Sequence, residues 1–440
     1  MSTRILIVGS WAKEQITVEN IRRADDYEVH AWLDTNNPGI TGQVDGFEIG
    51  SLYAIDEIVD YAVRQTVDLV LPTTASPLSA GLVDALSAKQ VPVFGPVRDA
   101  ARLESDKAWT RRLMQKCCPE AIPSFRVFTD RDEAVAHARE RDFEVAVKPT
   151  GLTEGLGVRV FGDQLQTPED VVAYIDDLFA DPGNDRVIVE EKLTGVEFTI
   201  QCLVDGENVI PTPVVQDYKK LLPAEEGPNT ASMGSFSDSD GLLPFLKQTD
   251  VDSAIDIVNR TVRAFRAETQ TDCRGFLYGQ FMLTADGIRL IEYNFRPGDP
   301  EWMNTLAVME DDLVDAISQL MQGSPRPIRF ADQATVCKYI VPPAYPEKLD
   351  EILDVNFDAG EIRAAGVELY YSCGVDGEGR YPVGSERGLA LLAAAGTVAA
   401  ANERIEVAID RVEGDFFYRS DIGTAELIAA KSREVEALRS

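Results

Sequence analysis

The first hundred residues alternate short apolar runs with longer segments in which apolar residues recur at helical spacing. Apolar runs at residues 5–8, 29–33, 69–72 and 91–94 have the length of buried strands. A segment between two of these runs, residues 79–89, has the pattern of a helix. Strands that alternate with helices are typical of a parallel α/β unit, and this part of the chain predicts one.

The next part of the chain repeats this mixture with different spacing. The pattern predicts a helix at residues 106–117 and a strand at 144–148, which runs into a glycine-rich loop at 151–157. Two further strands are predicted at 187–191 and 197–204. A second structural unit therefore follows the first.

The last hundred residues contain several short strands and an alanine-rich segment at 390–402 that favours a helix. This mixture predicts an α+β lid or cap. The turn sequence Gly95-Pro96 indicates the first boundary of the chain. The expected fold combines α/β and α+β parts: an amino-terminal parallel α/β domain at residues 1–105, a central domain at 106–330 and a small carboxy-terminal α+β domain at 331–440.

A hydrophobic content of 45% in 440 residues indicates a globular protein with a substantial core. No apolar run approaches the roughly 20 residues that a membrane span needs. The amino-terminal sequence enters a strand directly, without the basic region, long apolar segment and cleavage site of an export signal. We therefore expect a cytoplasmic protein whose six cysteines, which lack the spacing of a zinc site, are reduced and structural.

The formal net charge of −32 is large for a chain with an ordinary core. It argues against nucleic acid or an anionic membrane as a partner, because both would repel this surface. Acidic residues are scattered along the chain and form no single tail, so the charge belongs to the whole surface. A halophilic protein from a salt-adapted cytoplasm is one hypothesis, and an ordinary acidic protein is the alternative.

The sequence I-E-Y-N-F-R-P-G-D-P-E at residues 291–301 is the most informative stretch for chemistry. Glu292 and Asn294 are two residues apart at the end of an apolar run, so they point to the same side of a strand. Oxygen ligands at that spacing suit Mg²⁺, which nucleotide phosphates and water would also coordinate. Arg296 has the same parity and could clamp an anion beside the metal. The alternative is a half-buried strand whose polar face is solvated.

A glycine-rich loop follows the strand at 144–148. Gly151, Gly155 and Gly157 would let backbone N–H groups approach phosphate, because glycine has no Cβ. The loop is not a P-loop, since no G-K-[ST] ends it. Lys148 at the strand end and Lys107 in the preceding helix could supply cations for the phosphates. Each lysine taken alone could equally be a solvated surface residue.

Two other classes of site are poorly supported. Gly9-Ser10-Trp11 follows the first strand but lacks the second and third glycines of a dinucleotide fingerprint. His30 and His137 are the two histidines of the chain, and neither is near a nucleophile motif, which argues against a Ser-His-Asp hydrolase.

Residues 190–197, E-E-K-L-T-G-V-E, offer backbone groups for an adenine edge and a carboxylate suited to a ribose diol. With the lysines, the glycine loop and E-x-N in this order, the chain resembles the ATP-grasp superfamily and, within it, the glycinamide ribonucleotide synthetase (phosphoribosylamine–glycine ligase) family. The resemblance covers nearly the whole length. It rests on F-G-P at 94–96, Q-D-Y-K-K at 216–220, G-P-N-T-A-S-M-G at 227–234, R-G-F-L-Y at 274–278, the 291–301 run and F-Y-R-S-D-I-G at 417–423.

The resemblance implies an ATP-dependent amide-forming ligase that uses Mg²⁺ or Mn²⁺. ATP would phosphorylate the carboxylate of glycine, and the amine of phosphoribosylamine would attack the acyl phosphate in purine biosynthesis. The metal site would fall on Glu292 and Asn294. The ATP site would fall on Lys107, Lys148, Gly151, Gly155, Gly157, Glu190, Lys192, Leu193 and Glu197.

For the amino acid, the resemblance implies that Asp217 holds the ammonium group and that Arg296 lies near the carboxylate. Asn229, Thr230, Met233 and Gly234 would shape the surrounding loop. The alternative for Asp217 is a turn residue that caps its own backbone. The partners would be small molecules, and the protein would be a monomer or a weak homo-oligomer.

The chain departs from the family pattern mainly on the acceptor side. Members of the family usually have a first loop like G-G-G-R-E-H-A, whereas residues 9–15 of this chain read G-S-W-A-K-E-Q. Trp11 therefore occupies the position of a small residue, and Lys13 could supply the charge of the arginine. P-T-T-A-S-P-L at 72–78 lacks an acidic residue of the family, and Leu156 stands where the glycine loop generally has lysine. Two alternatives therefore stay open: an ATP-grasp ligase for another carboxylate and amine, and a non-catalytic nucleotide-binding paralogue.

Overall fold

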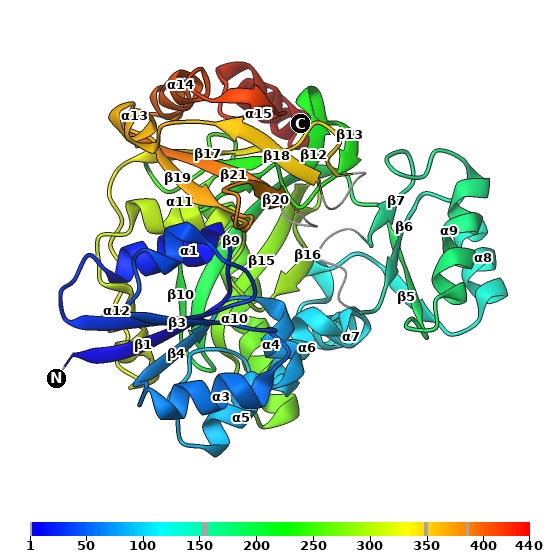
Figure 1. Cartoon of the computed structure of the whole chain (residues 1–440). Coiled ribbons are helices and arrows are strands. Elements are labelled where there is room, and N and C mark those ends of the chain that lie inside the picture. The colour runs from blue at the N-terminus through cyan, green and yellow to red at the C-terminus, as the bar shows by residue number, and fades with distance from the viewer. Residues whose placement is uncertain (1, 152–156, 347–350, 384–386) are drawn as a thin grey trace.

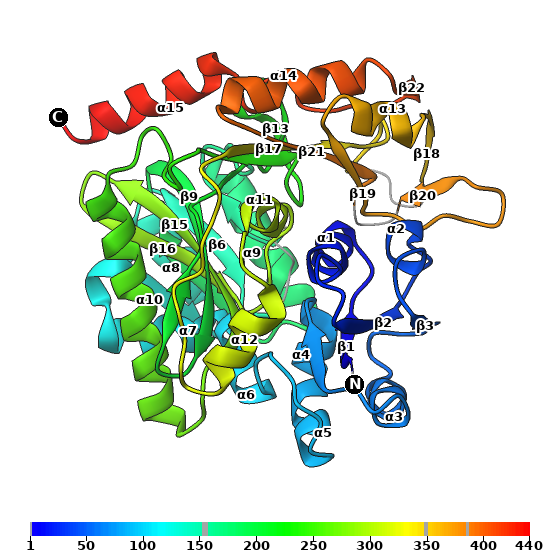
Figure 2. The same cartoon turned by 90° about the vertical axis from the view of Figure 1, so that its left-hand side faces the viewer.

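The computed structural model describes residues 2–151, 157–346, 351–383 and 387–440. This part of the chain contains four sheets of four or five strands, which are arranged around a central antiparallel sheet (Figures 1 and 2). The amino-terminal sheet lies on one side of the central sheet, a small lobe projects from another side, and the carboxy-terminal segment covers the top in the view of Figure 1.

The amino-terminal sheet is parallel, as the sequence predicts, with the strand order β3-β2-β1-β4. Its strands and helices are β1 (Thr3–Val8), α1 (Ala12–Ile21), β2 (Tyr27–Leu33), α2 (Pro38–Thr41), β3 (Gly46–Ile49), α3 (Ile55–Arg64), β4 (Leu69–Pro72), α4 (Ala75–Ala80) and α5 (Leu82–Ala88). Ile5 through Val8 are fully buried because helices cover both faces of the sheet. The expected fold class is confirmed here.

Two details of this unit differ from the sequence pattern. Residues 91–94 form no strand, because Val93 makes just an isolated bridge to Val70. The predicted helix at 79–89 is divided between α4 and α5 at Gly81. Gly81 has a φ of +92°, a left-handed conformation that ends the first helix and that glycine adopts without a Cβ clash.

The small lobe is an antiparallel sheet, in the order β5-β8-β6-β7, with two helices packed on it. Its elements are β5 (Phe125–Phe128), α8 (Arg131–Glu140), β6 (Val145–Pro149), β7 (Arg159–Val160), α9 (Pro168–Ala180) and β8 (Val187–Glu191). A separate apolar cluster that includes Val145, Val147 and Ile175 forms its core. The lobe therefore has its own packed interior beside the rest of the molecule (Figure 1).

The central sheet is antiparallel, in the order β10-β9-β15-β16, and carries long helices. Its strands are β9 (Gly195–Asp205), β10 (Val209–Pro211), β15 (Arg274–Thr284) and β16 (Gly287–Asn294). The helices α6 (Arg98–Ser105) and α10 (Gln248–Thr269) pack against it, and α7 (Lys107–Cys117) packs against both of these helices. Asp106 starts α7, because its Oδ1 accepts a hydrogen bond from the backbone N–H of Trp109 at 3.0 Å.

A five-stranded sheet in the order β11-β14-β17-β21-β19 joins the central and carboxy-terminal parts. Its strands are β11 (Gln216–Asp217), β14 (Gly234–Ser237), β17 (Ala334–Ile340), β19 (Glu368–Tyr371) and β21 (Leu389–Ala395). Two of them therefore come from the central segment of the chain and three from the end. The division into domains at residues 105 and 330 stays a prediction.

The predicted helix at 390–402 is wrong in its first half. Leu389–Ala395 is the strand β21, which pairs with both β17 and β19, and the helix α14 (Val398–Ile409) begins after Thr397. The Thr397 hydroxyl caps that helix by accepting from the backbone N–H of Ala400. Alanine favours a helix in isolation, but burial between two strands and under α14 overrides that preference.

The remaining elements connect these sheets or lie on the outside. They are η1 (Pro119–Ala121), β12 (Lys220–Leu222), η2 (Pro223–Glu225), β13 (Glu226–Asn229), α11 (Glu301–Val308), α12 (Leu313–Met321), β18 (Glu351–Asn356), α13 (Ala359–Ala364), β20 (Tyr381–Val383), β22 (Glu413–Asp415) and α15 (Ala425–Leu438). Among the helices of the described residues, none has the length and apolar character required for crossing a membrane. All six cysteine thiols are free, and five of them are buried, which agrees with structural cysteines.

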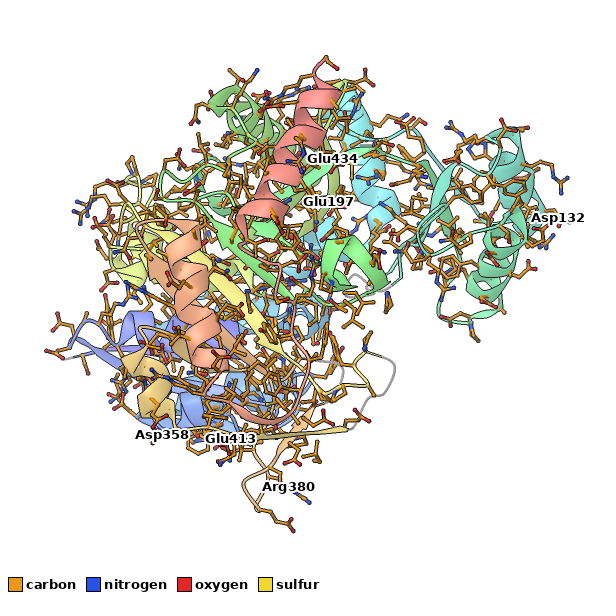
Figure 3. All side chains as sticks on the ribbon, turned by 90° about the horizontal axis from the view of Figure 1, so that it is seen from above. Asp132, Glu197, Asp358, Arg380, Glu413 and Glu434 are labelled. Atoms are coloured by element: carbon orange, nitrogen blue, oxygen red, sulfur yellow. The ribbon has the colours of Figure 1, made fainter. Side chains whose placement is uncertain are left out.

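Acidic side chains lie on the outside of many separate elements. Figure 3 labels Asp132 on α8, Asp358 before α13, Glu413 on β22 and Glu434 on α15, and all four are exposed. The negative charge of the sequence is thus spread over the surface and is not confined to one patch. Halophilic behaviour stays a proposal.

We expect the melting temperature to rise by at least about 5 °C between dilute buffer and 1 M KCl, because salt shortens the Debye length to about 3 Å and screens repulsion among surface carboxylates. Differential scanning calorimetry across a KCl series measures this shift. Sucrose at matched osmolarity is the control, since it favours compact states without screening charge. A melting temperature that KCl leaves unchanged would contradict the salt-adaptation hypothesis.

Candidate functional site

A cavity of about 320 Å³ lies where the small lobe meets the central sheet. Ala146 and Lys148 on β6 and Glu190 on β8 line it from the lobe, and Glu197 on β9 and Glu292 on β16 line it from the central sheet. The predicted ATP residues therefore come together from two separate sheets. Residues 152–156 of the loop between β6 and β7, which include Gly155 and Leu156, lie outside the described residues.

A buried ion-pair cluster forms the floor of this cavity. Glu190 accepts from Arg111 Nε at 2.5 Å and from Arg111 Nη2 at 3.1 Å, and its Oε2 lies 2.7 Å from Lys148 Nζ. All three side chains are nearly inaccessible to solvent. Burial would raise the pKa of Glu190, but Arg111 and Lys148 lower it to about 2. Glu190 therefore orients Lys148 and leaves this cluster with a net positive charge toward the cavity.

Burial lowers the pKa of Lys148, and the carboxylate of Glu190 opposes this effect. Arg111 also donates to the backbone oxygen of Ile291 at 2.6 Å, so the cluster is tied to the strand that carries Glu292. A desolvated ammonium fixed by a carboxylate is suited to bind phosphate oxygens.

Glu292 and Asn294 meet at the end of β16, as strand parity predicts. Asn294 Nδ2 donates to Glu292 Oε1 at 3.4 Å. Burial would raise the pKa of Glu292, but the cations of Lys107, Lys219 and Lys148 hold it below its usual value. Glu292 is therefore an ionised carboxylate among cations at neutral pH.

These two side chains fit the needs of Mg²⁺ beside a nucleotide. One carboxylate and one amide oxygen are enough when phosphates and water complete the octahedron. No group of three or more acidic, histidine or cysteine side chains that could hold a metal occurs in the described part of the chain. The donor set therefore suits a metal that arrives with phosphate, and not a metal held by protein ligands alone.

Arg296 lies beside this pair and is itself balanced by a buried acid. Its Nη2 donates to Asn294 Oδ1 at 3.4 Å, and its Nε lies 3.4 Å from Glu104 Oε1. Glu104 also accepts from the backbone N–H of Phe295 at 2.8 Å. The sequence pattern missed Glu104, which holds both Arg296 and the turn after β16 in position.

A second polar network surrounds Asp217 on the opposite wall. Lys219 Nζ donates to Gln280 Oε1 at 2.5 Å and lies 3.9 Å from both Asp217 Oδ2 and Glu197 Oε2. Gln280 in turn donates to Glu197. Burial opposes the charge of Lys219, but the carboxylates of Asp217 and Glu197 raise its pKa.

Asp217 has the features of a site for a small cation. Its side chain is buried, and its Oδ1 has no hydrogen-bond partner. Burial raises the pKa of Asp217 to about 7, against the opposing effect of Lys219. The alternative, in which Asp217 caps its own backbone, keeps the support of the backbone hydrogen bond that lowers the pKa of this carboxyl. An unsatisfied buried carboxylate oxygen costs free energy unless a donor from a ligand reaches it.

The remaining residues of the predicted ATP site do not all lie at the cavity. Leu193 lines the cavity, whereas the side chain of Lys192 bonds to Glu144 at 3.2 Å. Lys107 Nζ donates to the backbone oxygen of Gly151 at 2.8 Å, next to the loop. Gly157 accepts from the hydroxyl of Tyr174 at 2.8 Å, which fixes the far end of the loop on α9.

The loop after Asp217 is packed tightly against the carboxy-terminal sheet. Asn229 lines the cavity, while Thr230 and Met233 are buried, with Thr230 Oγ1 donating to the backbone oxygen of Lys219 at 2.8 Å. Gly234 has a φ of +153°, and a Cβ there would lie 2.3 Å from the backbone oxygen of Cys337. Glycine is therefore required where this loop joins β14.

The first loop is held by a buried carboxylate. Glu14 accepts from the backbone N–H of Trp11 at 2.8 Å and from Thr73 Oγ1 at 2.6 Å, and it pairs with Lys13 Nζ at 3.1 Å. The two segments that depart from the family pattern, residues 9–15 and 72–78, are thus linked through Glu14. Lys13 is buried and its charge is balanced by Glu14.

Several residues of the site could not be recognised from sequence motifs. Arg111 is four residues after Lys107 on α7, so helical spacing offered a signal for it. Lys219 lies inside the Q-D-Y-K-K motif. Gln280 on β15, which donates to Glu197, and Lys431 on α15, which lines the cavity, gave no signal, because tertiary packing alone brings them there.

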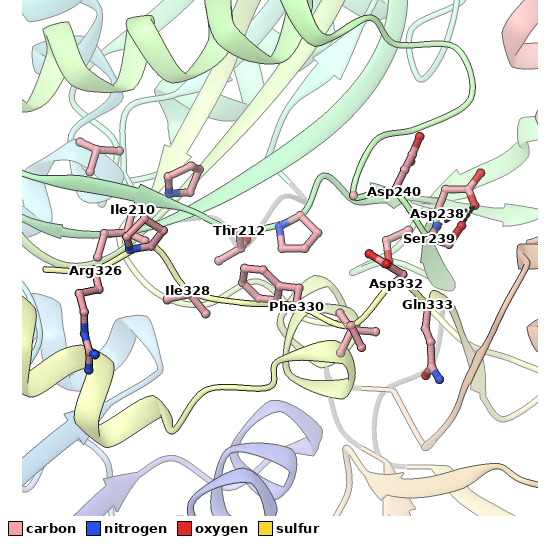
Figure 4. A pocket seen from close by; sticks show the side chains of 18 of the residues that line it. Ile210, Thr212, Asp238, Ser239, Asp240, Arg326, Ile328, Phe330, Asp332 and Gln333 are labelled. Carbon is pink, nitrogen blue, oxygen red and sulfur yellow. Dashed lines mark hydrogen bonds between the residues drawn. The ribbon is translucent and has the colours of Figure 1, made fainter.

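A larger cavity, of about 590 Å³, lies elsewhere in the molecule (Figure 4). Ile210, Ile328 and Phe330 form its apolar part, and Asp238 and Asp332 lie at one end (Figure 4). It contains none of the residues singled out from the sequence. Its charged groups do not converge as those around Glu190 do, so the smaller cavity is the candidate active site.

Comparisons with known proteins find relatives that match nearly the whole chain. Residues 3–104 match the family model described as the N domain of phosphoribosylglycinamide synthetase, and residues 105–302 match the one described as its ATP-grasp (A) domain. The phosphoribosylamine–glycine ligase of Methanothermobacter thermautotrophicus is 39% identical over 439 residues, which is 99% of this chain and 100% of that protein. That of Methanopyrus kandleri is 39% identical over 446 residues, which is 99% of each.

Solved structures show the same fold. The phosphoribosylamine–glycine ligase of Thermotoga maritima superimposes with a TM-score of 0.79 at 22% identity, over 95% of this chain and 100% of that one. The biotin carboxylase domain of the 2-oxoglutarate carboxylase of Hydrogenobacter thermophilus, solved with MgADP, gives a TM-score of 0.71 at 15% identity, over 99% of this chain and 98% of that one.

Proposed function

Because the chain belongs to the phosphoribosylglycinamide synthetase family, we propose that it is an ATP-dependent ligase that joins glycine to phosphoribosylamine in purine biosynthesis. The observation that carries this proposal is the convergence of Lys148, Glu190 and Glu292 on one cavity with the unsatisfied Asp217. Cations, a metal-ligand pair and a buried acid are the groups that this reaction needs.

The proposed reaction has two steps. A carboxylate oxygen of glycine attacks the γ-phosphorus of ATP, and the bond to the β-phosphate oxygen breaks, which gives an acyl phosphate and ADP. The amine nitrogen of phosphoribosylamine then attacks the acyl carbon, phosphate leaves, and the nitrogen loses a proton to give the amide. Both steps demand stabilisation of negative charge on phosphoryl oxygens.

Glu292 and Asn294 would hold Mg²⁺ or Mn²⁺, which when bound neutralises charge on the phosphates of ATP. Lys148, oriented by Glu190, would bind a phosphate oxygen beside it. Leu193 would pack on the base, and Glu197 would accept hydrogen bonds from the ribose hydroxyls. Lys107, at the entrance of the loop, would add a second cation to the phosphates.

Glycine would bind with its ammonium group at Asp217 Oδ1. The carboxylate of glycine would then be directed toward the phosphates, with Arg296 near it. Asn229 and the buried turn that contains Thr230 would close the remaining side of the pocket. This orientation presents a carboxylate oxygen to the γ-phosphate and excludes water from the acyl phosphate.

We expect glycine binding to weaken as the pH falls through about 7, because the pKa of Asp217 is raised to about 7 and its neutral form cannot pair with an ammonium. The apparent Kd for glycine should rise toward a limit of about tenfold per pH unit below that point. Calorimetric titration with glycine between pH 5.5 and 8.5 measures it.

The variant Asp217→Asn is the matched control, because it keeps the shape of the side chain and removes its titration. We expect it to bind glycine at least about 30-fold more weakly, and without the pH dependence, since an uncompensated ammonium loses a charged hydrogen bond. A wild-type glycine affinity that is constant from pH 5.5 to 8.5 would rule out Asp217 as the ammonium site.

The test of the proposed function is ADP release at molar KCl with Mg-ATP and glycine, with and without freshly generated phosphoribosylamine, and with mass detection of the product. Glycinamide ribonucleotide formed only with all three substrates supports the proposal. ADP formed with a different amine or acid would favour a ligase of another specificity. Nucleotide binding without any ADP release would favour a non-catalytic paralogue.

We further propose that the protein works in the cytoplasm as a monomer or weak homo-oligomer, with small molecules as its partners. Six free thiols agree with a reducing compartment. The strongly negative surface disfavours nucleic acid as a partner.

A further inference from the structure

Lys431 is a cation of the candidate nucleotide cavity that comes from the last helix of the chain. The other described residues around this cavity lie between positions 111 and 292, whereas Lys431 belongs to α15 (Ala425–Leu438). None of the sequence motifs includes it. Its place at the cavity results from how α15 packs.

The face of α15 that carries Lys431 is the face that packs on the molecule. Leu427 and Val435, four residues before and after Lys431, are both buried, so the three side chains share one stripe of the helix. The helix packs against β9 and β15, on which Glu197 and Met282 line the cavity. Figure 2 shows α15 lying above β9.

Lys431 differs from the other cations of the cavity in its partner. Arg111 and Lys148 share the buried carboxylate of Glu190, and Lys220 is paired with Asp163. Lys431 Nζ pairs with Glu434 Oε2 at 3.5 Å, one turn further along the same helix. The side chain of Glu434 is 43% exposed, and pairs of this kind contribute little to stability. A ligand can therefore replace Glu434 at small cost.

The position of α15 on the central sheet indicates which part of the nucleotide Lys431 would reach. The proposed metal ligands Glu292 and Asn294 are on the edge strand β16. The phosphates of the nucleotide, which share the metal, would therefore lie beside this strand. The strand β9 lies two positions away in the sheet, which is roughly 10 Å. Glu197, the proposed ribose ligand, is on β9, so α15 lies toward the adenosine end of the cavity.

We propose that Lys431 is a nucleotide-binding residue that donates a hydrogen bond to an acceptor of the adenosine moiety, a ring nitrogen or a ribose oxygen. This inference rests on the proposed function only in taking ATP as the nucleotide. It makes α15 part of the ATP site. Binding of the nucleotide would then secure the carboxy-terminal helix against the central sheet.

Isothermal titration calorimetry with MgADP and with AMP, on the full-length wild-type protein and Lys431→Met, tests the proposal. We expect the variant to bind each ligand about 5- to 20-fold more weakly, because one hydrogen bond from a charged donor is lost and methionine keeps the packing of the stem. Lys431→Arg should recover most of the affinity. Arg433→Ala, which removes one positive charge from the exposed side of α15, should bind like the wild type.

Steady-state kinetics distinguish a direct contact between Lys431 and the nucleotide from a purely structural role of Lys431. We expect the KM for ATP to rise with the Kd while kcat stays within twofold, because an adenosine contact is the same in the ground and transition states. Affinities of Lys431→Met within twofold of the wild type would overturn the proposal. So would a loss for MgADP without a loss for AMP, or a fall in kcat at unchanged KM. The binding experiment stands even if the wild type forms no glycinamide ribonucleotide, so the two proposals can fail separately.

Discussion

Glu292→Ala is expected to lower kcat by about 10⁴-fold while the protein stays folded, because it removes the carboxylate of the proposed metal pair. The cations of Lys107, Lys219 and Lys148 oppose the effect of burial and hold the pKa of Glu292 below its usual value, so this carboxylate is ionised. Without it, phosphates would approach these cations in geometries that no longer place the γ-phosphorus against glycine. ADP release under saturating Mg-ATP and glycine measures the loss.

Two further variants make this result specific. Asn294→Ala keeps the carboxylate and loses one oxygen ligand, so we expect a smaller fall in kcat, of about 10- to 100-fold, and a higher Mg²⁺ requirement. Glu403→Ala, at an exposed position of α14, should be as active as the wild type. Normal ADP formation by Glu292→Ala would remove this residue from the site.

Lys148→Met is expected to lower kcat by about 10³-fold, because it removes the ammonium that Glu190 directs into the cavity. Methionine retains the volume of the buried stem. Glu190 keeps its two hydrogen bonds from Arg111, so no carboxylate is left without a cation and the fold should survive. We expect the affinity for MgADP to fall less than kcat, because the charge on the transferred phosphoryl group grows in the transition state.

Lys116→Met is the matched control for this substitution. Lys116 lies on the same segment as Arg111 in α7, but its side chain is 63% exposed and pairs with Glu268. It should leave both kcat and nucleotide affinity unchanged, apart from the small effect of one surface charge. A Lys148→Met enzyme with wild-type kcat would show that the ammonium takes no part in phosphoryl transfer.

The strands of the fold could be predicted best where one segment is apolar throughout. The runs at 5–8 and 69–72 lie in β1 and β4, because a strand buried on both faces has few polar positions whatever its neighbours are. Residues 389–395 show the limit of this reasoning. Their alanines favour a helix in isolation, but they form β21 because β17 and β19 pair on either side.

The candidate site shows the same division between local and tertiary information. Glu292 and Asn294 lie together because side chains alternate along a strand. Lys107 and Arg111 lie on the same side of α7 because they are one helical turn apart. The role of Glu190 did not follow from its sequence: the E-E-K-L motif indicates a nucleotide contact, whereas the side chain of Glu190 lies between Arg111 and Lys148.

The sequence alone determined the family, the parallel α/β unit at its start, the spacing of the proposed metal ligands and the net charge, because each is carried by neighbouring residues or by composition. The tertiary structure alone decided which charges are paired, that Asp217 has an unsatisfied oxygen, and that Lys431 reaches the cavity from α15. Those outcomes depend on contacts between distant parts of the chain, such as α15 and β9. Burial and partner geometry, which set the pKa values and the ion pairs of the site, exist only once the sheets have packed together.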